Sequence, residues 1–99
     1  MRLTDQQVQA IKTVFANVFG QGEVVLFGSR VFDQKKGGDI DLYLNPTQNT
    51  QDAFDKKIAF LVALKQQIGE QKIDAVLSTF ASKELQQEVE HHGVLLCKI

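Results

Sequence analysis

The chain has 99 residues, 43% of them hydrophobic and 23% charged, which is typical of one small globular domain with a single core. No apolar run approaches the roughly 20 residues of a membrane-spanning helix, and MRLTDQQ at residues 1–7 lacks the apolar stretch of a secretory signal, so we expect a cytoplasmic protein without a membrane partner. The formal net charge of -1 argues against strong general binding to nucleic acid, and a single cysteine excludes an internal disulfide.

The first half of the chain predicts one helix and two strands. Thr4 and Gln7 fit a capping box, and apolar residues recur at helical spacing from there until Gly20. The run EVVLF at 23–27 has the composition of a buried strand. The alternation of acidic and aliphatic residues in DIDLYL predicts a second strand over 39–44.

The second half predicts a helix, a strand and another helix. Apolar spacing predicts a helix over 50–67, in which Phe54 is expected to join the core. The run KIDAVL predicts a strand over 72–77, and a helix should follow over 82–92. Residues 94–99 form a candidate edge strand. The prediction is therefore an α+β fold, in which a small mixed sheet of three core strands, plus this candidate edge strand, packs with helices.

Three aspartates are the candidate catalytic residues. A strand over 39–44 places Asp39 and Asp41 on one face, and Asp74 joins that face if the third strand lies beside the second. Three ionised carboxylates this close repel each other, so a cation must offset them. Oxygen ligands suit Mg²⁺, and two such ions roughly 4 Å apart can hold both oxygens of a displacement at phosphorus. On its own a D-x-D pair is a weak signal, and solvated aspartates are the plain alternative.

The stretch Gly28-Ser29-Arg30, directly after the first predicted strand, is the candidate nucleotide-binding segment. Glycine lets backbone N–H groups approach an anion, and the Ser29 hydroxyl adds a donor. Arg30 would add positive charge, as Lys35 and Lys36 of the following loop could. The plain alternative is a turn glycine followed by solvated lysines, and we favour it for the two lysines.

In this order and on these element types, the glycine-serine-arginine stretch, the D-x-D strand and the third aspartate resemble the signature of the DNA polymerase β-like nucleotidyltransferase superfamily. The sequence is most similar to the minimal form of that superfamily, the MNT proteins of prokaryotes, over about residues 24–77. We therefore expect a single nucleotidyltransferase domain over residues 1–99. Two departures concern the loop: Val31, Phe32 and Gly38 stand where many relatives have a small residue, a glycine and a serine.

The resemblance implies a role for each matching residue. Asp39 and Asp41 would hold two Mg²⁺ ions, and Asp74 would bind the catalytic metal and favour deprotonation of the acceptor hydroxyl. Gly28 and Ser29 would contact the triphosphate of the incoming nucleotide. Positioning and electrostatics supply most of the catalysis in such a transfer, which agrees with the residues present.

The resemblance also implies a partner protein, because the chain shows no extra domain to select an acceptor. Minimal relatives often act with an all-helical HEPN protein as a toxin–antitoxin pair, in some cases by attaching AMP from ATP to a tyrosine of the toxin. The expected activity is transfer of AMP to a hydroxyl of such a partner, within a homo- or hetero-oligomer. The alternative is an antitoxin that neutralises its partner by binding alone, and a small-molecule enzyme is disfavoured because 99 residues leave little surface for a closed acceptor pocket.

Overall fold

The computed structural model describes residues 1–34, 38–48 and 50–99, so Lys35 and Lys36 of the predicted loop lie outside the described residues. The elements are α1 (Asp5–Phe19), β1 (Gly22–Phe27), η1 (Gly28–Val31), β2 (Ile40–Pro46), α2 (Ala53–Ile68), β3 (Ile73–Leu77), η2 (Ser78–Phe80), α3 (Lys83–His92) and β4 (Val94–Lys98). This order confirms the predicted α+β fold and the edge strand. The two short 3₁₀ turns, η1 and η2, are additions to it.

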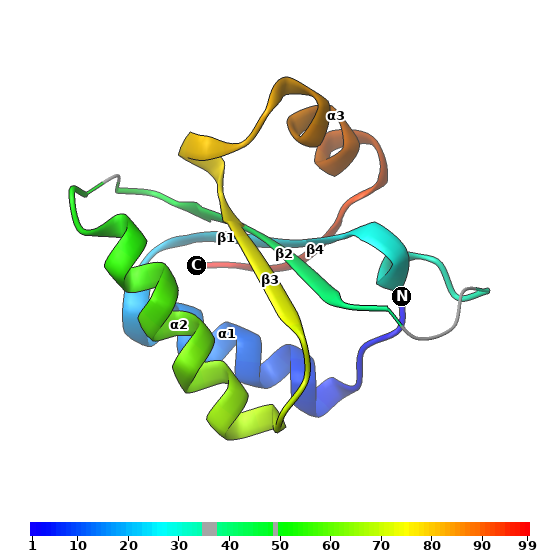
Figure 1. Cartoon of the computed structure of the whole chain (residues 1–99), viewed down its shortest axis with the longest axis horizontal. Helices are drawn as coiled ribbons and strands as arrows, with labels where there is room; N and C mark the ends of the chain where they lie inside the picture. The colour runs from blue at the N-terminus through cyan, green and yellow to red at the C-terminus, as the bar shows by residue number, and fades with distance from the viewer. Residues whose placement is uncertain (35–37, 49) are drawn as a thin grey trace.

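The four strands form one mixed sheet in the order β3-β2-β1-β4 (Figure 1). Strand β1 is antiparallel to both β2 and β4, whereas β2 and β3 run parallel. A parallel pair needs a long crossover connection, and α2 supplies it. The crossover places β3 directly beside the aspartate-bearing strand β2.

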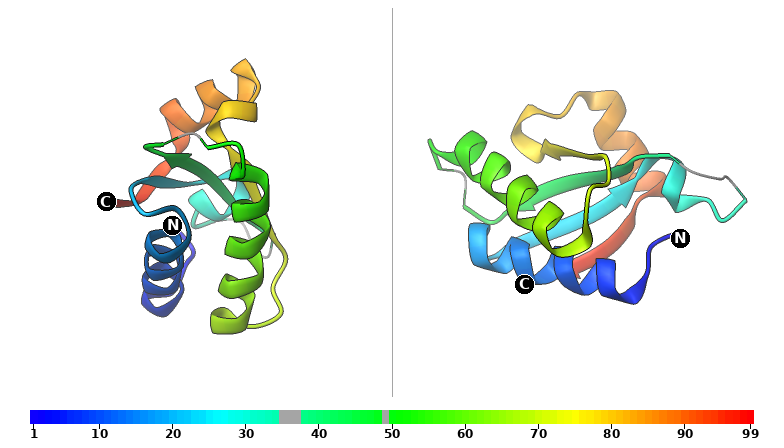
Figure 2. Two further views of the ribbon diagram at one scale, coloured as in Figure 1. Left: turned by 90° about the vertical axis from the view of Figure 1, so that its left-hand side faces the viewer. Right: turned by 60° about the horizontal axis from the view of Figure 1, so that its bottom comes forward.

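The helices divide between the two faces of the sheet. Helices α1 and α2 lie side by side on one face, and α3 lies on the other (Figure 2). The short helix α3 packs against β1, where the position of a Cβ on Gly93 would come within 2.5 Å of Val25. Strands β2 and β3 therefore keep a more open face on this side. No helix in the described ranges is both long and apolar enough to span a bilayer.

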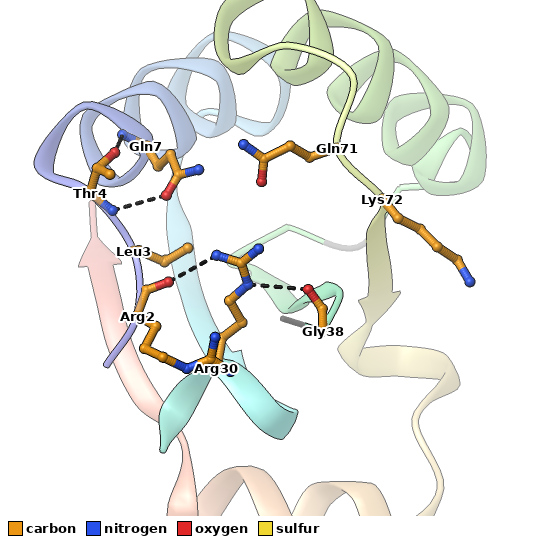
Figure 3. A pocket seen from close by; sticks show the side chains of 8 residues that line it. All are labelled: Arg2, Leu3, Thr4, Gln7, Arg30, Gly38, Gln71 and Lys72. Carbon is orange, nitrogen blue, oxygen red and sulfur yellow. Dashed lines mark hydrogen bonds between the residues drawn. The ribbon is translucent and has the colours of Figure 1, made fainter. Parts of the chain in front are cut away.

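Helix α1 begins with the predicted capping box. The backbone N–H of Gln7 donates to the Thr4 hydroxyl at 3.0 Å, and the backbone N–H of Thr4 donates to the Gln7 side chain at 2.9 Å (Figure 3). These bonds satisfy donors that a helix N-terminus leaves unpaired. Gly20, with a φ of 84°, caps the other end as predicted.

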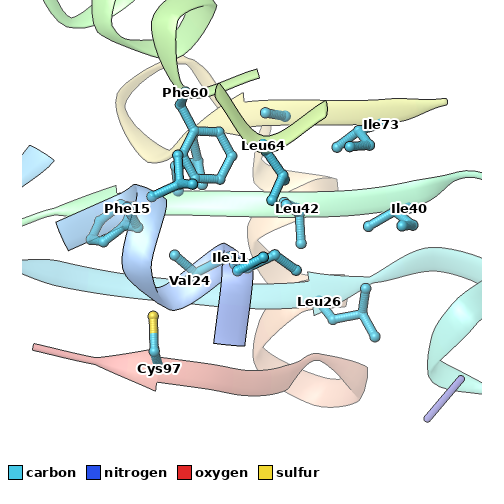
Figure 4. Close-up of a cluster of buried hydrophobic side chains, with 14 of the residues drawn as sticks. Ile11, Phe15, Val24, Leu26, Ile40, Leu42, Phe60, Leu64, Ile73 and Cys97 are labelled. Atoms are coloured by element: carbon cyan, nitrogen blue, oxygen red, sulfur yellow. The ribbon is translucent and has the colours of Figure 1, made fainter. Parts of the chain in front are cut away.

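The core lies between the sheet and the pair α1 and α2 (Figure 4). Phe15 of α1 meets Phe60 of α2 edge to face, with ring centroids 6.4 Å apart. Alternate residues of β2 and β3 point into this layer, which confirms the period-two reading of both strands. Cys97 of β4 is buried here as well, and burial raises the pKa of its thiol.

The prediction that Phe54 joins the core is wrong, because this side chain is 57% exposed. Helix α2 buries a different stripe, with Phe60 and Leu64 at its centre. The helical spacing of Phe54 is real, but it follows the outer side of α2. There four large side chains form what we call the apolar surface: Phe54, Ile58, Val62 and, from η2, Phe80.

Candidate active site

Asp41 and Asp74 lie directly opposite each other on neighbouring strands. Asp41 of β2 pairs in register with Asp74 of β3, and both point away from the core. Neighbouring strands of a sheet lie about 4.8 Å apart, so the two side chains are close neighbours on one face. The structure therefore brings together two of the three predicted carboxylates through a register that the whole sheet fixes.

The surroundings of Asp41 disfavour its ionised form. Burial raises the pKa of Asp41 above its ordinary value, and the negative charges of Asp74, Asp39 and Glu88 raise it further, against a smaller opposing effect of Lys72. Desolvation and like charges both act in this direction. A cation bound among these carboxylates would remove the conflict.

Asp39 precedes β2 and has a different neighbour. Its carboxylate lies 3.4 Å from the ammonium group of Lys72, with the two side chains 38% and 74% exposed. Ion pairs this exposed contribute little to stability, so the pair can open at small cost. Over the described ranges, no three acidic, histidine or cysteine side chains already stand at metal-binding spacing.

These carboxylates suit a hard cation such as the Mg²⁺ that the family resemblance implies. They offer oxygen donors only, and their mutual repulsion falls when positive charge binds. The register places Asp41 and Asp74 side by side, where they would be the first ligands of such an ion, whereas Asp39 is paired with Lys72.

Gly28 lies directly against the Asp41 carboxylate. Its φ of 79° is in the left-handed region, and a Cβ at this position would stand 2.3 Å from Oδ2 of Asp41. No other residue type fits both the backbone and the contact. The predicted glycine is therefore a requirement for placing the η1 backbone beside the acids.

Ser29 has a similar relation to Gly38. A Cβ on Gly38, whose φ is 89°, would stand 2.2 Å from the Ser29 hydroxyl oxygen. The position at which relatives have a serine thus holds a glycine that lets the chain approach Ser29 closely. This explains one of the two departures from the family pattern.

Glu88 is a site residue that the sequence did not single out. It lies on α3 and, with Gly28, Ser29, Phe32 and His92, it lines a small pocket of about 170 Å³. Its charge reaches Asp41. It stands on a strongly polar helix far along the chain, so no spacing or motif in the sequence could have linked it to the aspartates.

Arg30 was predicted to belong to the nucleotide-binding segment, but its side chain points away from the small pocket that Ser29 and Glu88 line. Its guanidinium donates from Nε to the carbonyl of Gly38 at 3.3 Å and from Nη1 to the carbonyl of Arg2 at 3.1 Å (Figure 3). It lines a larger pocket beside the N-terminus of α1, not the small pocket of Ser29 and Glu88.

Tyr43 and the two adjacent histidines lie near the site without joining the carboxylates. Tyr43 lies on the same face of β2 as Asp41 and is half-buried. His91 and His92 are both exposed, in the last turn of α3 before its cap at Gly93.

No family model matches the sequence, and no curated protein matches it. Among solved structures, the chain is similar to a crystal structure of a mutant toxin–antitoxin complex, MntA-HpeT, with a TM-score of 0.74 and 18% identity over 93% of this chain and 73% of the other. It is also similar to a chain in a second solved complex, that of the tri-AMPylated Shewanella oneidensis HEPN toxin with MNT antitoxin. Here the TM-score is 0.71 and the identity 19% over 94% of this chain and 71% of the other. The chain therefore has the fold of the MNT antitoxins.

Proposed function

We propose that this protein is a Mg²⁺-dependent nucleotidyltransferase that moves AMP from ATP to a hydroxyl of a HEPN-type partner, as the antitoxin of a toxin–antitoxin pair. The observation that carries the proposal is the register pair Asp41 and Asp74 beside the close-approach glycine, Gly28. Carboxylates that lie close enough for their negative charges to repel each other indicate a site for a cation and a phosphate ligand. One solved structure with this fold holds a tri-AMPylated HEPN toxin, which supports the choice of AMP and of the partner.

Two Mg²⁺ ions would be held by Asp41 and Asp74, with Asp39 after it leaves Lys72. When bound, they supply charge neutralisation at the triphosphate and at the acceptor oxygen. Gly28 and Ser29 line the small pocket, and the backbone of η1 and the hydroxyl of Ser29 would donate hydrogen bonds to phosphate oxygens.

The transfer itself is a displacement at the α-phosphorus of ATP. The acceptor oxygen forms a bond to this phosphorus, the bond to the bridging oxygen of the β-phosphate breaks, and pyrophosphate leaves. The proton of the acceptor hydroxyl passes to the carboxylate of Asp74, which is the more exposed member of the pair.

A labelling experiment tests the transfer. The protein, Mg²⁺ and ATP labelled at the α-phosphate are incubated with a HEPN-type partner protein, and label on that protein is measured. Asp41→Asn should abolish labelling, while Asp55→Asn, the same charge change on the exposed first turn of α2, should keep it. Equal labelling by wild type and Asp41→Asn would remove Asp41 from the reaction.

The apolar surface favours a second candidate function, neutralisation of a partner by binding alone. Four large apolar side chains exposed on a chain of this size are characteristic of a protein-binding surface. Phe54 and Phe80 also line an apolar pocket of about 310 Å³ beside the edge strand β3. If this function is correct, cells remain protected from the toxin by a chain carrying both Asp39→Asn and Asp41→Asn, and lose protection with Phe80→Ser. Loss of protection by the double aspartate variant, with binding retained, would favour catalysis.

A further inference from the structure

A further pocket lies beside the N-terminus of α1, and neither Asp41 nor Asp74 lines it. It has a volume of about 620 Å³ and lies where the N-terminus of α1, the end of η1 and the start of β3 meet. We call it the N-terminal pocket. The polar residues that define it are Arg2, Thr4, Gln7, Arg30, Gln71 and Lys72.

Positive charge borders this pocket on two sides. The guanidinium of Arg30 stands inside it, held by the carbonyls of Gly38 and Arg2 (Figure 3). Carbonyl partners orient a guanidinium but leave its net charge uncompensated, and within the described ranges no carboxylate forms an ion pair with Arg30. Lys72 also lines the pocket, but its side chain turns away from Arg30 and its ammonium group is paired with Asp39 (Figure 3). The fifteen-residue helix α1 turns its positive end toward the pocket.

Gln71 adds a second, independent observation. Its side-chain oxygen is buried and has no hydrogen-bond partner in the described structure. Figure 3 shows the Gln71 side chain reaching into the pocket toward the guanidinium of Arg30. A buried oxygen without a donor costs about 1–3 kcal/mol, and a donor from a bound molecule would offset this cost.

We propose that the N-terminal pocket binds a phosphate monoester of nucleotide size. The phosphate would accept hydrogen bonds from Arg30, and a hydroxyl of the same molecule would donate to the Gln71 oxygen. Phosphate alone would leave most of 620 Å³ empty, whereas pockets of roughly 300–1,000 Å³ hold molecules the size of a nucleotide. The pocket is a site apart from the carboxylate pair, and its occupancy requires neither Mg²⁺ nor transfer.

A titration in the presence of EDTA tests this site separately from the proposed transfer. ¹⁵N-labelled protein is titrated with AMP, inorganic phosphate and adenosine, while NMR follows the Nε–H of Arg30 and the side-chain amide of Gln71. The backbone amides of Asp41 and Asp74 report on the carboxylate face. AMP should shift the Arg30 and Gln71 signals most strongly, phosphate should shift them more weakly, and the Asp41 and Asp74 signals should stay in place.

Gln71→Glu provides the matched variant. It places a carboxylate where the ligand would sit beside Arg30, so the Kd for AMP should rise at least tenfold while the melting temperature is kept or raised. Gln66→Glu, the same change on an exposed position of α2, should leave the Kd within twofold. Gln71→Met, which removes the oxygen without adding charge, should weaken binding by a smaller factor.

Three results would overturn the proposal. The first is an absence of shifts with all three ligands, which would mean that the pocket holds only water. The second is binding of adenosine as tight as that of AMP, which would exclude recognition of phosphate. The third is unchanged affinity for AMP in Gln71→Glu.

Discussion

The contact between Gly28 and Asp41 leads to a prediction that can be worked out quantitatively. In Gly28→Ala the new residue keeps a φ of 79°, which costs an L-residue about 1–2 kcal/mol. Its Cβ also meets Oδ2 of Asp41 at 2.3 Å, a collision that adds about 1–2 kcal/mol, within the usual range for overpacking. The free energy of unfolding should therefore fall by about 2–4 kcal/mol.

A double-mutant cycle separates the two costs. Asp41→Ala removes the carboxylate, and the remaining Cβ of residue 41 lies 3.4 Å from the added methyl group, which is ordinary contact. In this background Gly28→Ala should cost only the backbone strain of about 1–2 kcal/mol. Gly20→Ala, at a φ of 84° with no atom within 4 Å, gives a second reference for strain alone.

Urea denaturation of the four chains at one pH measures the cycle. The expected coupling between the two positions is about 1–2 kcal/mol, well above the roughly 0.5 kcal/mol by which independent sites deviate from additivity. A coupling below that level would show that the Asp41 side chain moves aside freely. Gly28 would then not fix the position of this carboxylate.

Three further predictions concern charge, capping and the core. Because the fold raises the pKa of Asp41, the stability that its protonated form contributes is present at low pH and is lost as pH rises through that pKa. Asp41→Asn should therefore raise the melting temperature at pH 7 in EDTA, with an advantage over wild type that shrinks on acidification; a constant advantage would contradict the assigned cause. Thr4→Ala removes the capping box and should cost about 1 kcal/mol in urea denaturation. Phe60→Ala should cost about 3–5 kcal/mol by the same measurement. The matched change Phe54→Ala, at an exposed position, should cost about 0.5 kcal/mol or less.

The sequence predicts the elements well because their signals are local. The capping box at Thr4, the glycine stop at Gly20 and the period-two alternation of β2 each depend on neighbours in the chain, and the structure confirms each. The pairing of Asp41 with Asp74 is less local, but a crossover helix between two strands favours a parallel neighbour, so this arrangement could also be inferred.

The features that could not be predicted from the sequence depend on packing between elements that are distant in the chain. Helix α2 has apolar residues on more than one side, and only its docking on α1 decides that Phe60 is buried while Phe54 is exposed. Likewise, the direction of Arg30 depends on carbonyls of Arg2 and Gly38 that the fold brings to it. Neither has a periodic or motif signature.

Strand β3 has a single neighbour in the sheet, β2, and its other edge is unpaired within the described structure. Strands held on one side are the first to detach in local opening, while the remainder of a sheet stays closed. Such an opening would carry Asp74 away from Asp41 and leave β1, β2 and β4 intact. Hydrogen exchange at the amides of residues 73–77 would thus measure the free energy that separates the assembled carboxylate pair from this opening, a quantity distinct from the stability of the whole chain.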